Sequence, residues 1–273
     1  MDICTIIDDF QIGMCLINME KPNKIIISTF DLDLSLFLIE FYNPDIEYEI
    51  FYWYILNDKD ITIPSNLHLH QKERNHCKFW YIINDKQVRF ILTSCNLTYG
   101  MLHNCLQSFV SFTVDKSDKW NETEFKNDLI DYKKTLFPFF NLFNINLDYN
   151  LFKLLKNKLI YNIPGYYNGI EKWYLNQRHL FVDCNNITGN YLNDKNKTLI
   201  IRQAIPPNFS KIICYYSLDR INTKNTILNS IPFNYVFHYK LYYSNDSVLV
   251  SSNNFSFNYK MNYELGIIIN KSQ

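Results

Sequence analysis

The stretch HQK (70–72), followed by the strand-like run VRFILTSCNLT (88–98), decides the fold because it occurs twice. In the second half of the chain, HYK (238–240) is followed by SVLVSSNNFS (247–256). Each copy therefore supplies a histidine, a lysine and, after an apolar strand, a Ser-x-Asn sequence. This repetition predicts a single two-fold site that both halves build together.

These residue types are suited to phosphoryl transfer. A phosphodiester is a poor electrophile, so catalysis needs donors on its oxygens, a nucleophile, and an acid on the leaving-group side. Imidazole has a pKa of about 6.5, so one ring attacks as the neutral base while the other donates a proton. No cofactor or metal is required by this chemistry. The candidate groups are two imidazoles, two ammonium groups and two amides: His70, His238, Lys72, Lys240, Asn96 and Asn254.

Each of these short sequence patterns also has a less specific explanation. A lone His-x-Lys is most often a surface coincidence, and a lone Ser-x-Asn is often turn chemistry. A further group of histidines and cysteines suggests zinc, but its spacing fits no common zinc pattern, and free cysteine is usually a small buried residue. We therefore expect no metal at this group, which consists of His68, His76, Cys77, Cys95, His103 and Cys105.

The bulk composition limits the class of protein. The chain has 273 residues and is 47% hydrophobic, which is enough for a packed core. Its 27 basic and 27 acidic residues cancel, which argues against a protein that coats nucleic acid through its overall field, although a local basic groove stays open. The start of the chain is acidic, no apolar run approaches about 18 residues, and the seven cysteines include no Cys-x-x-Cys. These features predict an intracellular protein, nuclear or cytoplasmic, without a membrane span. We also expect a monomer.

Strand-like and helix-like segments alternate, which predicts an α/β fold. Thr123 is the expected N-cap of the 123–140 helix, and Pro138 its end. We place the boundary between two halves, 1–138 and 139–273, near this proline. Expected strands are 47–57, 78–84, 88–94, 198–205, 211–218, 246–252 and 264–270, and expected helices are 123–140 and 150–159, while 24–42 passes from strand to helix.

The sequence resembles the tyrosyl-DNA phosphodiesterase I branch of the phospholipase D superfamily. General members of that superfamily have an Asp four residues after the motif lysine. Four residues after Lys72 and Lys240, this chain has His76 and Ser244 instead. Absence of this Asp is characteristic of the branch. Further segments resemble family landmarks from about Phe30 to Ile269. They are FDLDLSLFL (30–38), TSCNLTYGMLHNCLQSFVSF (93–112), TEFKNDLIDY (123–132), IPGYYNG (163–169) and NYELGIII (262–269).

The resemblance implies two α/β halves with mixed sheets flanked by helices, and a shared active site. It implies that His70 is the nucleophile and His238 the acid, later the base, with Gln107 and Glu264 as supporting residues. A carboxylate raises the basicity of a nucleophilic imidazole, whereas an amide orients the acid without adding charge. We therefore pair Glu264 with His70 and Gln107 with His238. Phosphate ligands would be Lys72, Lys240, Asn96 and Asn254, and substrate-binding candidates are Ser94, Ser252 and Ser256.

The implied activity is hydrolysis of 3′-phosphotyrosyl and other 3′-blocking adducts through a covalent phosphohistidine. The implied partners are single-stranded or frayed DNA 3′ ends and a topoisomerase-derived tyrosyl peptide. Alternatives are a phospholipase D-type nuclease and a catalytically silent protein that binds DNA ends. The family's long N-terminal regulatory segment has no counterpart, so a minimal catalytic core is expected. Both DNA-contacting aromatic positions of the family also differ: IPSNLHL (63–69) lacks one, and Ser28 stands near the other.

Overall fold

A computed structural model describes most of the chain. The described residues are 21–56, 61–103, 105–121, 123–177, 181–183, 199–201, 212–214, 227–228, 236–238, 240–252 and 261–270. No helix in these ranges is long and apolar enough to cross a membrane.

The first half is built on a six-stranded mixed sheet with the order β5-β3-β1-β6-β7-β9. Neighbours β5, β3 and β1 run parallel, whereas β6, β7 and β9 continue the sheet antiparallel. The β-branched and aromatic residues of these segments favour strands. The bounds are β1 (Lys24–Ser28), β3 (Glu47–Tyr52), β5 (Leu67–Gln71), β6 (Phe79–Ile83), β7 (Gln87–Thr93) and β9 (Phe109–Asp115).

The second half is built on another six-stranded sheet, with the order β11-β10-β19-β18-β17-β12 and only antiparallel neighbours. Its bounds are β10 (Leu159–Ile163), β11 (Tyr167–Asn168), β12 (Phe181–Asp183), β17 (Leu241–Tyr243), β18 (Ser247–Ser251) and β19 (Glu264–Asn270). The remaining strands form smaller sheets: β2 (Asp31–Asp33) with β4 (Tyr54–Leu56), β8 (Cys105–Leu106) with β16 (Val236–Phe237), and β13 (Leu199–Ile201), β14 (Ile212–Cys214) and β15 (Ile227–Leu228) together.

Helices flank the sheets, as the α/β prediction requires. The helix expected at 123–140 is divided, and its expected cap is wrong, because α4 has Phe125 at its N-cap without a side-chain hydrogen bond. The α-helices are α2 (Leu34–Glu40), α3 (Tyr99–His103), α4 (Lys126–Thr135), α5 (Phe137–Phe140), α6 (Tyr149–Leu155) and α7 (Gly169–Leu175), and the 3-10 helices are η1 (Lys119–Asn121), η2 (Thr123–Phe125) and η3 (Asn141–Phe143).

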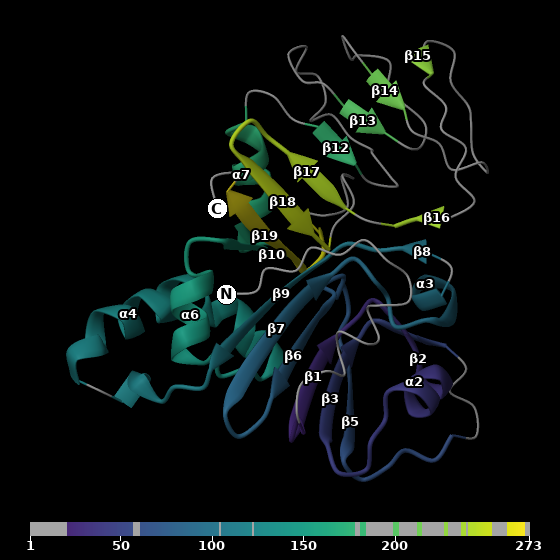
Figure 1. Cartoon of the computed structure of the whole chain (residues 1–273), viewed down its shortest axis with the longest axis vertical. Coiled ribbons are helices and arrows are strands. Elements are labelled where there is room, and N and C mark those ends of the chain that lie inside the picture. Colours follow the sequence, from purple (N-terminus) through teal and green to yellow (C-terminus); the bar gives the residue numbers. More distant parts are fainter. Residues whose placement is uncertain are drawn as a thin grey trace.

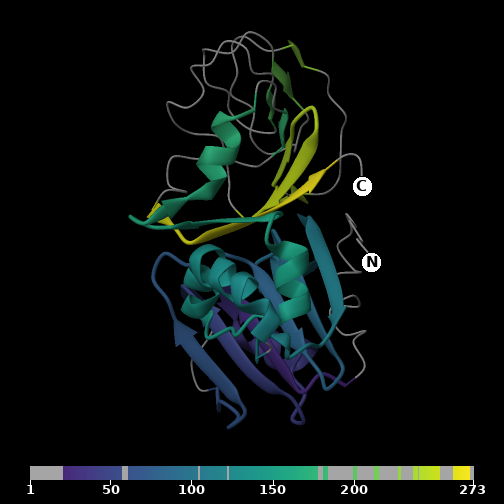
Figure 2. The same ribbon diagram turned by 90° about the vertical axis from the view of Figure 1, so that its left-hand side faces the viewer.

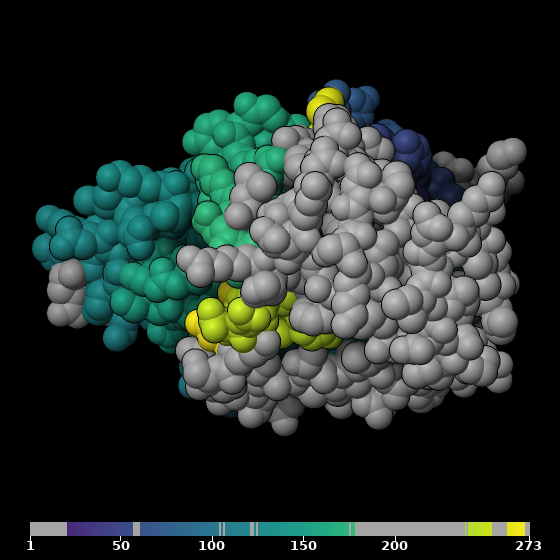
Figure 3. All heavy atoms as spheres, turned by 90° about the horizontal axis from the view of Figure 1, so that it is seen from above, coloured from purple at the N-terminus to yellow at the C-terminus, as the bar shows by residue number. Residues whose placement is uncertain are grey.

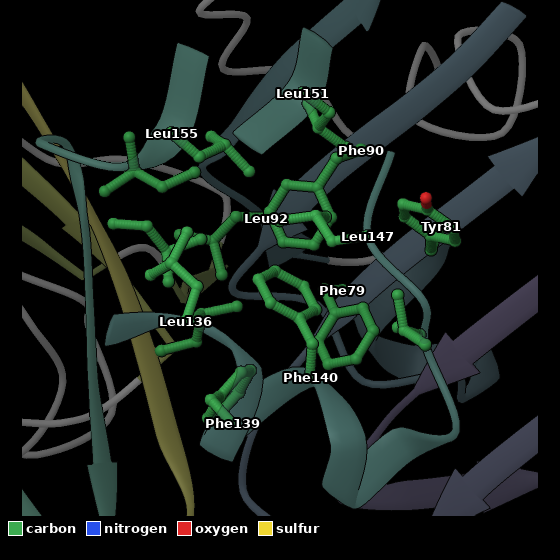
Figure 4. Close-up of a cluster of buried hydrophobic side chains, with 14 of the residues drawn as sticks. Phe79, Tyr81, Phe90, Leu92, Leu136, Phe139, Phe140, Leu147, Leu151 and Leu155 are labelled. Atoms are coloured by element: carbon green, nitrogen blue, oxygen red, sulfur yellow. The ribbon is translucent and has the colours of Figure 1, made fainter. Parts of the chain in front are cut away.

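The first sheet separates two hydrophobic clusters. On one face, α2 and α3 cover the alternate residues Trp80, Ile82 and Ile91. On the other face, α4–α6 project as a lobe (teal in Figures 1, 2 and 3) and cover Phe79 and Phe90. Figure 4 shows the centre of this second cluster, where aromatic and leucine side chains of strands and helices interlock.

The second cluster also includes strands of the second sheet. Leu241, Val250, Leu265 and Ile267 belong to it together with the β6, β7 and α4–α6 residues. The two halves therefore share one core. The predicted boundary near residue 138 falls inside α5, within the helical segment that joins the sheets, and it stays a prediction.

Ile267→Ala should destabilise the whole molecule, because Ile267 is fully buried in the shared cluster. Loss of a buried isoleucine costs about 2–5 kcal/mol of unfolding free energy. Urea unfolding followed by circular dichroism should show this loss in one transition. Ile268→Ala is the matched control, since Ile268 is partly exposed on the same strand and should cost clearly less. Two separated transitions in the wild type would contradict a shared core.

Candidate functional site

Backbone hydrogen bonds and a parallel β-bridge connect the two halves just before His76. We call such a pairing between the halves a crossing. The amide of His76 donates to the carbonyl of Tyr263 at 3.1 Å, and the amide of Tyr263 donates to the carbonyl of Arg74 at 2.8 Å. Asn75 and Tyr263 form a parallel bridge between these bonds. The Asn75 side chain is also fixed, because its Nδ2 donates to Phe51 O at 3.1 Å and to two further acceptors on Ser28 and Thr29.

A second parallel pairing of backbone segments also joins the two halves. In this pairing, the histidine comes from the second half and its polar neighbour from the first half. Strand β16 pairs in parallel with β8, so that Phe237 lies opposite Leu106 (Figure 1). Asn75 and Tyr263 are the residues before His76 and Glu264, and Phe237 and Leu106 are the residues before His238 and Gln107. Each crossing therefore brings a histidine of one half beside a polar residue of the other.

The two histidines have different partners. Nδ1 of His76 lies 2.8 Å from Oε1 of Glu264, and Nδ1 of His238 lies 3.0 Å from Oε1 of Gln107. The contact between Gln107 and His238 is the one expected from the sequence. The carboxylate, however, contacts His76, so the predicted pairing of Glu264 with His70 is wrong.

A serine holds each of these partners. Ser252 Oγ donates to Glu264 Oε2 at 2.7 Å, and Ser94 Oγ donates to Gln107 Oε1 at 2.8 Å. Both serines are fully buried. Their hydroxyls thus act inside the protein, on the histidine partners. We correct their predicted role from substrate binding to positioning.

Two lysines occupy equivalent places. Nζ of Lys78 donates to the carbonyl of His76 at 2.8 Å, and Nζ of Lys240 donates to the carbonyl of His238 at 3.0 Å. Nζ of Lys240 also lies 3.2 Å from Nε2 of His238. Lys78 and Lys240 are buried to 1% and 0% exposure, so two ammonium groups are held beside the histidines. Ammonium groups form strong, charge-assisted hydrogen bonds to phosphate oxygens, so this pair of lysines is suited to binding a phosphate.

Asn96 is the first of the two predicted amide ligands. It is buried after β7, and its Nδ2 donates to Oδ2 of Asp31 at 2.9 Å. An amide nitrogen carries two N–H groups, so one is left for a substrate oxygen. Its predicted equivalent, Asn254, lies outside the described residues, as does Ser256.

Burial is the main cause of the lowered pKa of both imidazoles. Burial first, and then the positive charges of Lys240 and Lys78, hold the pKa of His238 well below its usual value. Burial also lowers the pKa of His76, although Glu264 opposes this shift. Burial lowers the pKa of Lys78 to about 8, against the effect of Glu264. Near neutral pH, both rings are therefore neutral and Lys78 is charged.

His70 and Lys72 lie elsewhere. His70 stacks on Phe51 at 4.5 Å, and its Nε2 lies 3.5 Å from Oε2 of Glu49. Nζ of Lys72 donates to Leu142 O at 3.3 Å. Nζ of Lys72 also lies 5.0 Å from the ring centroid of Tyr263. Among the described residues, neither the His70 nor the Lys72 side chain contacts His76, Lys78, His238 or Lys240.

Strand order explains this separation. Register places His70, Phe51, Ser28 and Phe79 in one row across β5, β3, β1 and β6. His70 is thus three strands from the start of β6, or about 14 Å at ~4.8 Å per strand. The places expected for His70 and Lys72 in the shared site are occupied by His76 and Lys78.

A signal for His76 was present in the sequence. Lys78 is followed at once by the strand FWYII, as Lys240 is followed by LYY, whereas Lys72 is followed by Glu-Arg-Asn. The two hairpins are closed alike, because Thr93 N donates to Lys78 O at 2.9 Å and Ser251 N donates to Lys240 O at 3.1 Å. The repeated unit is therefore His-x-Lys, hairpin, Asn. In the part of the chain that the structure describes, no three His, Cys, Asp or Glu residues gather to hold a metal ion.

Solved structures share this architecture. Yeast tyrosyl-DNA phosphodiesterase superposes with a TM-score of 0.64 at 11% identity, over 98% of this chain and 90% of that chain. Polyphosphate kinase from Porphyromonas gingivalis superposes with a TM-score of 0.55 at 10% identity, over 98% of this chain and 47% of that chain. No family model matches the sequence, and no curated protein matches it. The phospholipase D-like α/β fold predicted from the sequence is confirmed.

Binding of an oxyanion should be coupled to proton uptake. An anion between Lys78 and Lys240 offsets the charges that lower the pKa of His238, so this ring should gain up to about one proton at pH 6–7. Sulfate is suitable because it does not titrate in this range. Calorimetry in two buffers of different ionisation enthalpy measures the uptake. His238→Asn should still bind sulfate but without the uptake, and uptake that persists in this variant would assign the proton to another group.

Proposed function

We propose that this protein is a phosphodiesterase that hydrolyses 3′-phosphotyrosyl and other 3′-blocking adducts at single-stranded or frayed DNA ends. The observation that carries the proposal is the unequal pair of histidines. Each histidine follows an equivalent backbone pairing and lies beside a buried lysine. However, one ring contacts a carboxylate and the other contacts an amide. The sequence landmarks and the fold shared with the yeast enzyme support the same activity.

In the first step, His76 is the nucleophile. With Nδ1 toward Glu264, the Nε2 lone pair attacks phosphorus, and the carboxylate stabilises the positive ring that forms. The bond from phosphorus to the tyrosyl oxygen breaks on the opposite side. His238, protonated once the diester has bound, gives its proton to that oxygen. The product is a phosphohistidine that retains the DNA 3′ oxygen.

In the second step, His238 acts as the base. It takes a proton from a water molecule, and the water oxygen attacks phosphorus from the side that the tyrosine has left. The bond from phosphorus to Nε2 breaks, which returns His76 and leaves a 3′-phosphate on the DNA. Gln107 suits this exchange, because an amide orients the ring without holding its proton by charge.

Replacement of His238 and replacement of His76 should affect adduct formation and turnover differently. His238→Ala keeps the nucleophile, and a phenol with a pKa of about 10 departs slowly without an acid. Without His238, no base activates the water that hydrolyses the phosphohistidine. A covalent protein–DNA adduct that is labile to acid should therefore accumulate. His76→Ala should form no adduct and lose nearly all turnover. A 3′-phosphotyrosyl oligonucleotide, with adducts separated by denaturing electrophoresis, tests both.

His70→Ala is the matched control and should keep turnover within about threefold, since His70 lies outside the site. An adduct in His76→Ala would reverse the two roles. Cleavage of DNA with only internal linkages would instead indicate a general nuclease, and binding without cleavage of any substrate would indicate a silent DNA-end-binding protein.

Hydrolysis should proceed in excess chelator. Lys78, Lys240 and Asn96 already supply positive charge and a donor for the phosphate oxygens. We expect initial rates in EDTA to stay within about twofold of those in added magnesium. Activity lost in EDTA and regained with a divalent ion would overturn the metal-free mechanism.

A further inference from the structure

Three aromatic side chains connect the protein surface to His76. Trp53 and Tyr54 stack on each other, with ring centroids 5.1 Å apart and planes inclined by 12°. Phe30 meets both rings edge-on, at 5.4 Å and 5.3 Å. On its other side, Phe30 lies 4.9 Å from the imidazole of His76. We call Phe30, Trp53 and Tyr54 the aromatic ladder.

The ladder is held by the backbone. The amides of Trp53 and Tyr54 both donate to the carbonyl of Phe30, at 3.1 Å and 3.0 Å, and β2 and β4 continue this pairing. Gln71 Nε2 donates to the carbonyl of Trp53 at 3.3 Å. The rings are therefore in place before anything binds, which lowers the entropic cost of binding.

Core packing does not account for the ladder. None of its three residues belongs to either hydrophobic cluster of the described chain, and Tyr54 is 48% exposed. Nζ of Lys78 lies 5.6 Å from the ring centroid of Phe30, so a cation of the phosphate site also approaches the ladder. Aromatic rings that lead from a cationic centre to an exposed tyrosine are suited to a ligand with a charged group and a flat apolar face.

The chemistry decides which part of the substrate reaches the ladder. In an in-line displacement, the leaving group departs on the side opposite the nucleophile. The ladder lies against His76, the nucleophile of the proposed function, so the departing tyrosyl ring cannot occupy it. The retained nucleotides can. Nucleobases stack on aromatic side chains whatever their sequence.

We propose that the aromatic ladder is the stacking platform for the last unpaired bases of the retained DNA strand. This proposal rests on the proposed function and names the residues that hold its substrate. The platform is different from both family aromatic positions considered above, because those positions are Ser28 and the segment 63–69 in this chain.

The experiment measures binding, so it needs no turnover. The probe is a fluorescent single-stranded oligonucleotide with a 3′-phosphate, compared with the same probe made abasic at its last two positions. Wild type should prefer the base-bearing probe by roughly 5- to 150-fold for each stacked base. Trp53→Leu should lose most of this preference while its affinity for the abasic probe stays within about twofold.

Tyr166→Leu is the matched control, because Tyr166 is 71% exposed on the second half and should leave the preference unchanged. Tyr54→Leu, at an exposed position, gives a second test if Trp53→Leu fails to fold. Equal losses for both probes, or a preference that survives in Trp53→Leu and Tyr54→Leu, would overturn the platform. If wild type binds neither probe, the proposed function itself fails.

Discussion

The exchange of short parallel pairings between the halves is the constraint on which the site depends. Asn75 pairs with Tyr263, and Phe237 pairs with Leu106, so each half supplies the residue that orients the other half's histidine. Neither half contains a complete site. The shared core beneath these pairings makes the arrangement rigid, because shifting one sheet against the other would expose buried leucine and isoleucine side chains.

Within this nearly symmetric frame, one substitution separates the chemistry of the two sides. Glu264 and Gln107 occupy equivalent places and are held by equivalent serine hydroxyls. A carboxylate stabilises positive charge on its imidazole, and an amide does not. In the proposed mechanism, this difference of a single functional group divides attack and proton transfer between two otherwise similar histidines.

Much of this arrangement could be predicted from the sequence. Runs of β-branched and aromatic residues predicted the strands β1, β3, β6, β7, β18 and β19 of the two main sheets. The family resemblance predicted the contact of Gln107 with His238. The prediction of His70 was wrong because two His-x-Lys sequences, 70–72 and 76–78, precede the same apolar run, and only Lys78 leads directly into a strand. Phe30, Trp53 and Tyr54 had no local signal at all, since their contacts depend on the pairing of β2 with β4. Burial of Ser94 and Ser252 likewise follows from long-range packing.

The crossed pairing also bears on how such a chain arose. A single half would leave its histidine without a partner, so an ancestral half would have had to work as a dimer. In a symmetric dimer of identical chains, both histidines face the same residue, because a two-fold axis makes the two environments equal. Fusion of the copies into one chain removes that restriction. The unequal pair of Glu264 and Gln107 is a difference that two identical chains cannot encode.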